Sequence, residues 1–400
     1  IDLQEGDEKY LPKLRFCLSL TDLVIDACLG TGIKGAPRGL IDEVIKLVNE
    51  LEKPVLAVDV PSGIDATSGV VLGNCIQAEI TVTLAAPKIG LFVYPGAEYV
   101  GKLYVANIGI PPQVIEEASQ GALLESRLVK GFLPERPPFG HKGTFGHVLV
   151  LAGSVGMTGA AALAAKAALR SGAGLVSLGV PTSLNDVLEA KLTEAMTIPL
   201  PETQERSLSI EALPMIQSQL ERMNALVIGP GLSQDPSTGQ LVEALLLDVS
   251  CPVVLDADGL NLAAKTDVLE KRTDASCPLV ITPHPGEMAR LLGLSVQEVQ
   301  ADPVTTAGKA AELFRCTTVL KGAGTIVAVP SGDFWINTTG NVGMATGGSG
   351  DVLSGIIGAL LAAGISPVHA AGIGVYVHGL AGDLARKRRE EISLIAGDLI

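Results

Sequence analysis

The feature that most constrains this chain is a regular alternation of short apolar runs with helical stretches, in which each apolar run ends at a polar or glycine-rich cluster. Strands that alternate with helices along a sequence form parallel sheets joined by right-handed crossovers. Hydrophobic residues make up 47% of the 400 residues and aromatic residues only 3%. This mix is typical of small helices packed on β-branched strands. We therefore predict an α/β protein with layered domains.

The sequence predicts two domains of this kind. The alternation first runs from Leu23 to Leu103, and a longer series follows from residue 147. Between Pro111 and Gly143 the chain turns polar and proline-rich, so we place a boundary near residue 118 and predict domains at 1–118 and 119–400. The chain starts without Met and stops inside a predicted helix, and we expect both ends to be cut.

Charge and cysteine usage exclude several classes of function. A net charge of −14 and a pI near 4.9 disfavour binding to nucleic acid or to anionic membranes. The longest apolar run, at 354–365, is shorter than the about 20 residues that span a bilayer. The six cysteines contain no CxxC pair, which disfavours zinc or disulfides. We expect a cytoplasmic protein.

In the second half, polar residues repeatedly follow apolar runs. They are Ser154, Gly231, Asp256 with Asp258, His284 with Glu287, and Lys321. In a parallel α/β sheet such positions are the carboxyl ends of strands, where ligands bind. A series of five such clusters predicts one shared cleft.

The stretch TGGSGD, from Thr346 to Asp351, predicts an anion hole. Its glycines permit positive φ and expose backbone N–H groups, and the helix that follows directs its positive end to the same place. We expect Asp351 to stay ionised and to act as a base through its position, taking a proton from a hydroxyl that attacks a phosphoryl group. The alternative is that Asp351 only caps the helix.

Three further segments are candidates for ligand contacts. The turn KGAGT could cradle nucleotide phosphates with its amides and the Lys321 ammonium, or it could be an ordinary hairpin corner. In ITPHPGE two prolines hold His284, which favours a ligand contact over a purely structural role. A helix is predicted to begin between Thr158 and Ala160, with its first amides free for a ligand.

The first half carries its own pair of acidic strand ends. Asp26 and Asp59 each follow an apolar run, so they should lie on neighbouring parallel strands. The run GTGIKGAP offers bare amides and Lys34 to a phosphate. Asp26 and Ser62 are hard oxygen ligands that could share a cation. Alternatively, the two aspartates only cap turns.

Taken together, these motifs resemble the bifunctional NAD(P)H-hydrate repair enzymes. DACLGTG and DVPSGIDATSG look like the epimerase domain of that family. HKGTFGHVLVLAGS, GPGL, DADGLN, TPHPGE, KGAGT and TGGSGD look like its dehydratase domain, in the family's order. The resemblance implies a Rossmann-like three-layer domain followed by a ribokinase-like α/β three-layer domain.

The resemblance also implies an activity and a set of site residues. The epimerase would interconvert the two epimers of hydrated NADH or NADPH, and the dehydratase would use ADP or ATP with Mg²⁺ to remove water from the S epimer. The catalytic residues would be Asp351 and Asp59. The hydrate would contact Ala160, Gly231, His284 and Asp351 in the dehydratase, and Gly30, Thr31, Gly32, Ile33, Lys34, Gly35, Ala36 and Asp59 in the epimerase. The nucleotide would contact Lys321, Gly322, Ala323, Gly324, Thr325 and Gly350, and K⁺ would bind Asp26 and Ser62. We also expect a homo-oligomer.

One departure from the family and two competing functions remain. The family's asparagine- and glycine-rich phosphate loop has no match before Asp26, so either the chain is truncated, which the missing Met favours, or its epimerase half is inactive. A ribokinase-like small-molecule kinase, such as a vitamin-precursor kinase, would share the anion hole and Asp351. A nucleotide-sensing protein without turnover is the third alternative.

Overall fold

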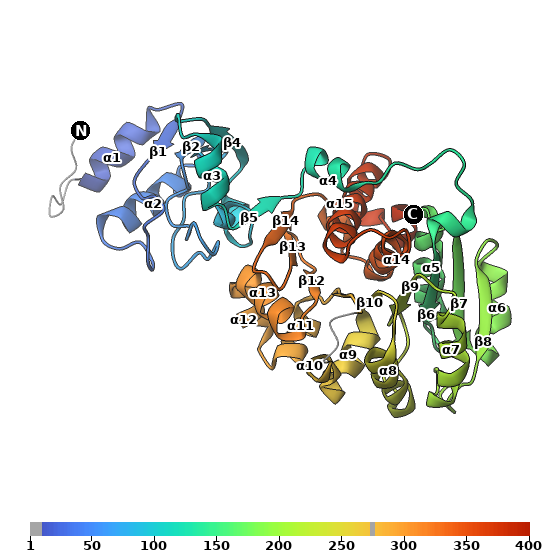
Figure 1. Ribbon diagram of the computed structural model, residues 1–400. Coiled ribbons are helices and arrows are strands. Elements are labelled where there is room, and N and C mark those ends of the chain that lie inside the picture. The colour runs from blue at the N-terminus through green and yellow to red at the C-terminus, as the bar shows by residue number, and fades with distance from the viewer. Residues whose placement is uncertain (1–9, 273–276) are drawn as a thin grey trace. The chain divides into compact units, whose positions relative to one another are not determined.

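The computed structural model describes residues 10–272 and 277–400 and divides into two compact units (Figure 1). Unit 1 comprises the chain up to Ser119 together with residues 300–302. Unit 2 comprises residues 120–299 and 303–400. In the described part of the chain, no helix is both long enough and apolar enough to cross a membrane.

Unit 1 is built on a four-stranded, all-parallel sheet in the order β1-β2-β3-β4. The strands are β1 (Val24–Asp26), β2 (Val55–Val58), β3 (Ile80–Leu84) and β4 (Lys102–Ala106), and the helices are α1 (Tyr10–Ser19), α2 (Leu40–Glu50) and α3 (Pro112–Ala118). Asp26 pairs with Ala57 and Ala57 with Thr81, and all three side chains are buried on one face. Ile25, on the opposite face, is 65% exposed. The register therefore turns Asp26 into the interior.

Unit 2 is built on a ten-stranded sheet in the order β5-β14-β13-β12-β11-β10-β9-β6-β7-β8. The strands are β5 (Gly121–Leu123), β6 (His147–Leu151), β7 (Leu175–Pro181), β8 (Met196–Leu200), β9 (Ala225–Ile228), β10 (Val253–Leu255), β11 (Leu279–Ile281), β12 (Thr317–Leu320), β13 (Thr325–Ala328) and β14 (Phe334–Asn337). Neighbours are parallel except β13, which is antiparallel to β12 and to β14. At the KGAGT turn, β12 and β13 therefore form the hairpin corner that was one of the two interpretations of that segment.

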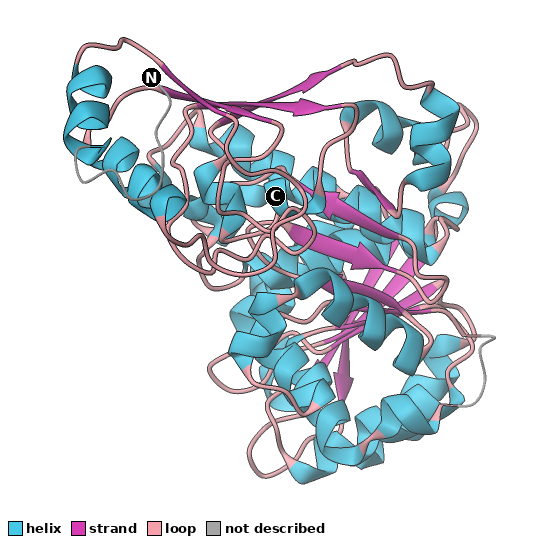
Figure 2. Ribbon diagram, turned by 90° about the vertical axis from the view of Figure 1, so that its left-hand side faces the viewer, coloured by secondary structure: helices cyan, strands magenta, loops and turns pink. Residues whose placement is uncertain are grey.

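Helices lie on both faces of the unit 2 sheet (Figure 2). They are α4 (Ser126–Phe132), α5 (Thr158–Arg170), α6 (Asn185–Lys191), α7 (Leu213–Leu220), α8 (Pro236–Asp248), α9 (Ala257–Thr266), α10 (Val268–Lys271), α11 (Pro285–Leu292), α12 (Val296–Ala301), α13 (Pro303–Phe314), α14 (Ser349–Ala362) and α15 (Pro367–Arg386). Because both faces are covered, the central strands β9 to β11 are buried at every position.

Helices α5 and α14 pack together at unusually close range. A Cβ added to Gly355 of α14 would lie 2.1 Å from the backbone oxygen of Ala164 in α5. The same Cβ would lie 3.0 Å from the Cβ of Ala167, and α5 buries five alanines in all, Ala161, Ala164, Ala165, Ala167 and Ala168. Small residues on both helices thus let the two backbones approach. The contact fixes where α14 begins.

Candidate functional sites

A pocket of about 540 Å³ lies at the carboxyl ends of the central strands of unit 2. It is lined by Gly156, Met157, Gly159, Ala160, Leu163, Gly231, Ala257, Asp258, Asn261, Glu287, Gly347, Gly348 and Asp351. Three predicted residues from separate segments, Ala160, Gly231 and Asp351, therefore line one cavity. Gly231 has a φ of +63°, and a Cβ there would lie 2.8 Å from the Cβ of Met157. Only a residue without a side chain fits this wall of the pocket.

The glycine-rich turn places the first turn of α14 at this pocket. Gly348 precedes the helix with a φ of +95°, in the left-handed region that favours glycine. A Cβ on Gly348 would lie 2.6 Å from Leu163. Asp351 is the third residue of α14, and no side chain caps the helix. Its carboxylate is therefore beside the positive end of the helix without serving as the N-cap.

A buried network of charged residues lies behind this turn. The Lys321 Nζ donates to Asp256 Oδ1 at 2.7 Å and lies 3.9 Å from Glu287 Oε2. The Ser354 hydroxyl donates to Asp256 Oδ2 at 2.5 Å. A Cβ on Gly350 would lie only 3.2 Å from Lys321 Nζ. The network thus joins the ends of β10 and β12 to the start of α14.

The ionisation of Asp351 differs from the sequence prediction. Burial raises its pKa, the nearby Asp256 carboxylate raises it further, and the opposing effect of Lys321 does not compensate, so the pKa rises to about 7. Asp258 and Glu287 act in the same direction. The expectation that Asp351 keeps an ordinary low pKa was wrong, because burial of the carboxyl group, together with neighbouring carboxylates from other segments, disfavours its ionised form. Asp351 is instead poised to exchange a proton near neutral pH.

His284 occupies a helix-capping position rather than the wall of the pocket. Its Nδ1 accepts from Gly286 N at 2.9 Å and from Glu287 N at 3.3 Å, and Glu287 Oε2 accepts from His284 N at 2.8 Å. This reciprocal arrangement is a capping box. Burial lowers the pKa of His284, and Lys321 lowers it further. Glu287, which the sequence analysis noted without assigning a role, lines the pocket instead. Its position three residues after His284 was the sequence signal for the capping box.

The turn from Lys321 to Thr325 connects β12 to β13. The Lys321 side chain points to Asp256, whereas Gly322 and Ala323 are exposed. Thr325 Oγ1 donates to Gly322 O at 2.9 Å and closes the turn. The exposed backbone of this turn is available to a ligand, while the lysine ammonium is held by a carboxylate.

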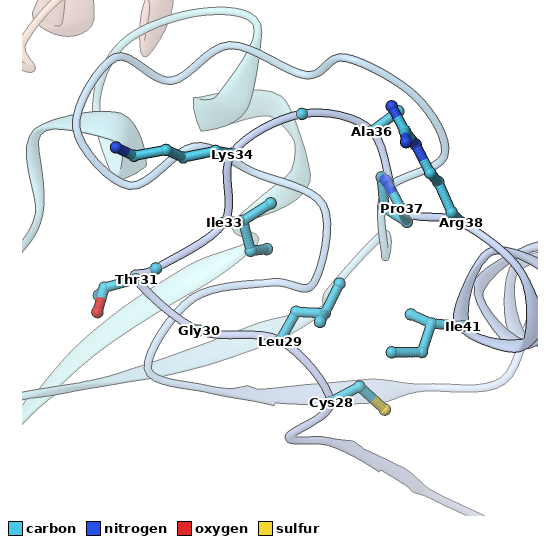
Figure 3. Close-up of a pocket in the computed structure, with 12 residues that line it drawn as sticks. Cys28, Leu29, Gly30, Thr31, Ile33, Lys34, Ala36, Pro37, Arg38 and Ile41 are labelled. Atoms are coloured by element: carbon cyan, nitrogen blue, oxygen red, sulfur yellow. The ribbon is translucent and has the colours of Figure 1, made fainter.

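A second candidate site lies in unit 1, where a pocket of about 540 Å³ follows β1. Its lining includes every predicted residue from Gly30 to Ala36, and in addition Cys28, Leu29, Pro37, Arg38 and Ile41. Figure 3 shows Lys34 and Arg38 on different sides of the loop. Arg38 was not predicted. Two cations and three glycines on one loop suit an anionic group.

Asp26 and Ser62 meet at the base of this loop. Asp26 Oδ1 accepts from the Ser62 hydroxyl at 2.7 Å and Oδ2 accepts from Ser62 N at 2.7 Å. The Asp26 side chain is 3% exposed, and no lysine, arginine or histidine pairs with it among the described residues. A buried carboxylate without a cationic partner, beside a hydroxyl oxygen, offers hard oxygen ligands to a cation.

Asp59 contacts a residue that sequence reasoning missed. It lies at the end of β2 with a φ of +70° and pairs with Lys88, which also donates to Thr83 Oγ1 at 3.1 Å and to Leu84 O at 2.8 Å. Burial acts to raise the pKa of Asp59, but the bond from Lys88 and that from Leu84 N lower it overall. The prediction that β1 and β2, which carry Asp26 and Asp59, are parallel neighbours is confirmed. Lys88 follows a strand end only after four residues, so its spacing gave no signal.

Unit 2 has a largely parallel sheet that helices cover on both faces. At its strand ends lie a glycine turn, a helix N-terminus and a buried carboxylate. These features define an α/β enzyme of the ribokinase-like class. Solved structures agree. An ADP/ATP-dependent NAD(P)H-hydrate dehydratase from Bacillus subtilis, co-crystallised with ATP and Mg²⁺, matches with a TM-score of 0.58 and 35% identity, over 70% of this chain and 94% of that one. A ribokinase-like superfamily protein from Enterococcus faecalis matches with a TM-score of 0.61 and 26% identity, over 70% and 93%.

Family models and curated relatives identify the family. The model described as NAD(P)H-hydrate dehydratase matches residues 148–399, and that described as YjeF-related protein N-terminus matches residues 4–90. The bifunctional NAD(P)H-hydrate repair enzyme of Moorella thermoacetica is 48% identical over 98% of this chain and 74% of its own length. That of Escherichia coli is 38% identical over 94% and 70%. The chain belongs to the family of bifunctional NAD(P)H-hydrate repair enzymes, which confirms the resemblance read from its motifs.

Proposed function

We propose that this protein restores hydrated NADH and NADPH. Unit 2 dehydrates the S epimer at the expense of ADP or ATP, and unit 1 interconverts the R and S epimers. The single observation that carries the proposal is the convergence of Ala160, Gly231 and Asp351 on one pocket whose carboxylate has a pKa of about 7. Family membership and the ATP- and Mg²⁺-bound Bacillus subtilis relative support the choice of reaction.

The reaction begins with a proton transfer at Asp351. Hydroxide is a poor leaving group, so the ring hydroxyl of the hydrate must first be converted to a better one. Asp351, ionised above about pH 7, accepts the hydroxyl proton as the oxygen attacks the terminal phosphoryl group of the nucleotide. The backbone N–H groups of the first turn of α14, beside Gly350, stabilise the transferring phosphoryl group.

The second half of the reaction breaks the carbon–oxygen bond. The ring nitrogen supplies the electron pair that expels phosphate, and the ring then loses a proton to regenerate the dihydropyridine. The hydroxyl oxygen leaves as part of the phosphate. Gly231, which tolerates no side chain, lets the hydrate approach the wall of the pocket, and Ala160 in the first turn of α5 lines the same pocket with only a methyl group.

The nucleotide brings the metal that the reaction needs. Among the described residues, no group of three or more His, Cys, Asp or Glu side chains could hold a metal ion. Mg²⁺ keeps most of its waters and binds largely through nucleotide phosphates, which fits such a pocket. There it neutralises phosphate charge. The exposed turn at Gly322 and Ala323, together with Gly350, would hold the nucleotide, and Lys321 would act through its bond to Asp256.

In unit 1 we assign the hydrate to the pocket after β1. Lys34 and Arg38 would contact its phosphates, and Asp59, paired with Lys88, would be the catalytic carboxylate. Asp26 and Ser62 fit a bound K⁺, which would balance the buried charge of Asp26 and hold the loop in place. We further propose that the protein acts as a homo-oligomer in the cytoplasm.

The recovery of absorbance at the NADH band tests this function. The wild type is incubated with hydrated NADH and Mg²⁺ in the presence of ADP, of ATP and of neither nucleotide. Nucleotide-dependent recovery is expected, and recovery beyond the S-epimer fraction would mark epimerase activity of unit 1. Asp351→Ala should lower the rate by about 10²- to 10⁴-fold, the range of general-base catalysis, with nucleotide affinity nearly intact. Recovery that is independent of nucleotide would refute the proposal.

A further inference from the structure

Unit 2 contains another cavity, of about 640 Å³, next to the pocket of Asp351. It is lined by Ser154, Val155, Met157, Gln204, Glu205, Arg206, Ser233, Asp235 and Pro236. Met157 lines both cavities. Two hydrogen bonds also cross the shared wall: Ser154 Oγ donates to Gly231 O at 2.8 Å, and Ser233 N donates to Asp258 Oδ2 at 2.9 Å. The two cavities therefore adjoin each other at Met157, and we call the second one the Arg206 cavity.

Arg206 is held in place without a carboxylate partner. Its Nε donates to Ser183 Oγ at 2.8 Å and its Nη2 to Ser183 O at 3.3 Å. Ser183 is oriented in turn by Glu202, whose Oε2 accepts from both Ser183 N and Ser183 Oγ. No described ion pair includes Arg206, although the chain carries a net charge of −14. The guanidinium keeps further N–H donors for an anion.

Glu205, which is exposed, gives the same cavity a different chemistry. In dinucleotide sites generally, an acidic side chain accepts hydrogen bonds from a free ribose 2′-hydroxyl, whereas an arginine accommodates a 2′-phosphate. The Arg206 cavity holds both residue types side by side. The Asp235 carboxylate is already engaged, because it caps α8 by accepting from Ser237 N at 2.8 Å. Glu205 and Arg206 are therefore the charged residues of this cavity whose side chains are not fully engaged.

Resting on the proposed function, we propose that the Arg206 cavity binds the adenosine ribose of the dinucleotide hydrate, with Arg206 contacting the 2′-phosphate of NADPH hydrate and Glu205 the 2′-hydroxyl of NADH hydrate. The hydrated ring must lie beside Asp351, so the rest of the dinucleotide requires a second space that adjoins the first. The pair then sets the selectivity between the two hydrates, and a single site serves both.

Binding of the reaction products NADPH and NADH tests this pair without any turnover. Their dissociation constants are measured by nucleotide fluorescence for the wild type, Arg206→Ala and Glu205→Gln. Arg170→Ala is the control, because Arg170 is exposed at the opposite end of α5 from the pocket. Arg206→Ala should weaken the binding of NADPH about tenfold, which is the effect of losing one charge-assisted hydrogen bond at an exposed site. It should weaken the binding of NADH less than about twofold. Glu205→Gln should weaken NADH and tighten NADPH, because it removes a like charge.

The outcomes separate this inference from the proposed function. The inference is overturned if Arg206→Ala weakens the binding of both dinucleotides equally, as a contact to the shared pyrophosphate would produce. It is also overturned if the affinity for neither dinucleotide changes. The Michaelis constants of the wild type and Arg206→Ala for the two S hydrates, measured with saturating ATP, should show the same selective loss. A wild type that binds both products but restores neither hydrate would refute the proposed function. The role of Arg206 would then still be tested by the ratio of the NADPH and NADH dissociation constants. Unchanged melting temperatures confirm that the variants fold.

Discussion

At the scale of single residues, the account rests on how Asp351 is perturbed. Burial raises its pKa most, the carboxylates of Asp256, Asp258 and Glu287 raise it further, and Lys321 opposes them. Because these groups come from three strand ends, no local sequence window contains the cause. A base with a pKa near the working pH is largely in its ionised form and is still strong enough to accept a proton, and general-base catalysis requires both.

The pH dependence of dehydration follows from this pKa. Asp351 accepts a proton only when ionised, so kcat/KM should fall by about tenfold for each pH unit below about 7 and level off above it. A carboxylate with the ordinary pKa near 4 would instead give a flat profile between pH 5 and pH 8. Rates measured with hydrated NADH at saturating ATP across this range distinguish the two. A flat profile in the wild type would contradict the assignment.

Gly350 should tolerate no large side chain. A Cβ lies 3.2 Å from Lys321 Nζ and 3.7 Å from Asp256 Oδ2, so Gly350→Val would displace the lysine and crowd the phosphate position. Turnover should fall by about 10²-fold or more, comparable to the loss of an anion-hole donor, and Gly350→Ala should be affected less. Steady-state rates of both variants provide the measurement, with circular dichroism as the check on folding. Normal turnover in Gly350→Val would exclude this placement of the phosphate.

At the scale of elements, the close packing of α5 on α14 positions both helix starts at the pocket. Gly355→Ala would place a Cβ 2.1 Å from Ala164 O, and we expect it to destabilise the protein by about 3 kcal/mol. Gly308→Ala in α13 is the matched control, because its Cβ meets nothing within 4 Å and alanine favours the helix. Urea unfolding of the two variants gives the comparison. Equal stability would show that the helices can separate freely.

The elements themselves were largely readable from the sequence, whereas the contacts between side chains were not. Alternating apolar runs predicted the parallel strands, and glycines and prolines marked where helices begin, as at Gly348 before α14 and Pro285 in α11. The pairing of Lys88 with Asp59 and the bond from Lys321 to Asp256 depend on where loops return in three dimensions. Such contacts join residues from different segments, and periodicity carries no information about them.

At the scale of the whole molecule, the two units have separate cores. One large cluster of buried apolar side chains lies between Leu124 and Leu399, and two clusters of unit 1 have their buried members between Leu18 and Val100. The pocket of Asp351 is built only from unit 2. A chain of residues 120–400 should therefore dehydrate the S hydrate with a kcat within about twofold of the full chain. With a mixture of R and S hydrates, this fragment should restore only the S-epimer fraction, because it lacks the epimerase unit. Loss of all turnover in a folded fragment would show that the pocket needs unit 1.

The central claim is that the ring hydroxyl leaves as phosphate, and an oxygen label tests it most directly. NADH is hydrated in ¹⁸O-water, the S hydrate is isolated, and the enzyme restores it with ATP and Mg²⁺ in ordinary water. Phosphoryl transfer to the hydroxyl predicts that the ¹⁸O appears in inorganic phosphate, one label for each NADH restored, as seen by mass spectrometry. Label released into water, with phosphate unlabelled, would contradict the account.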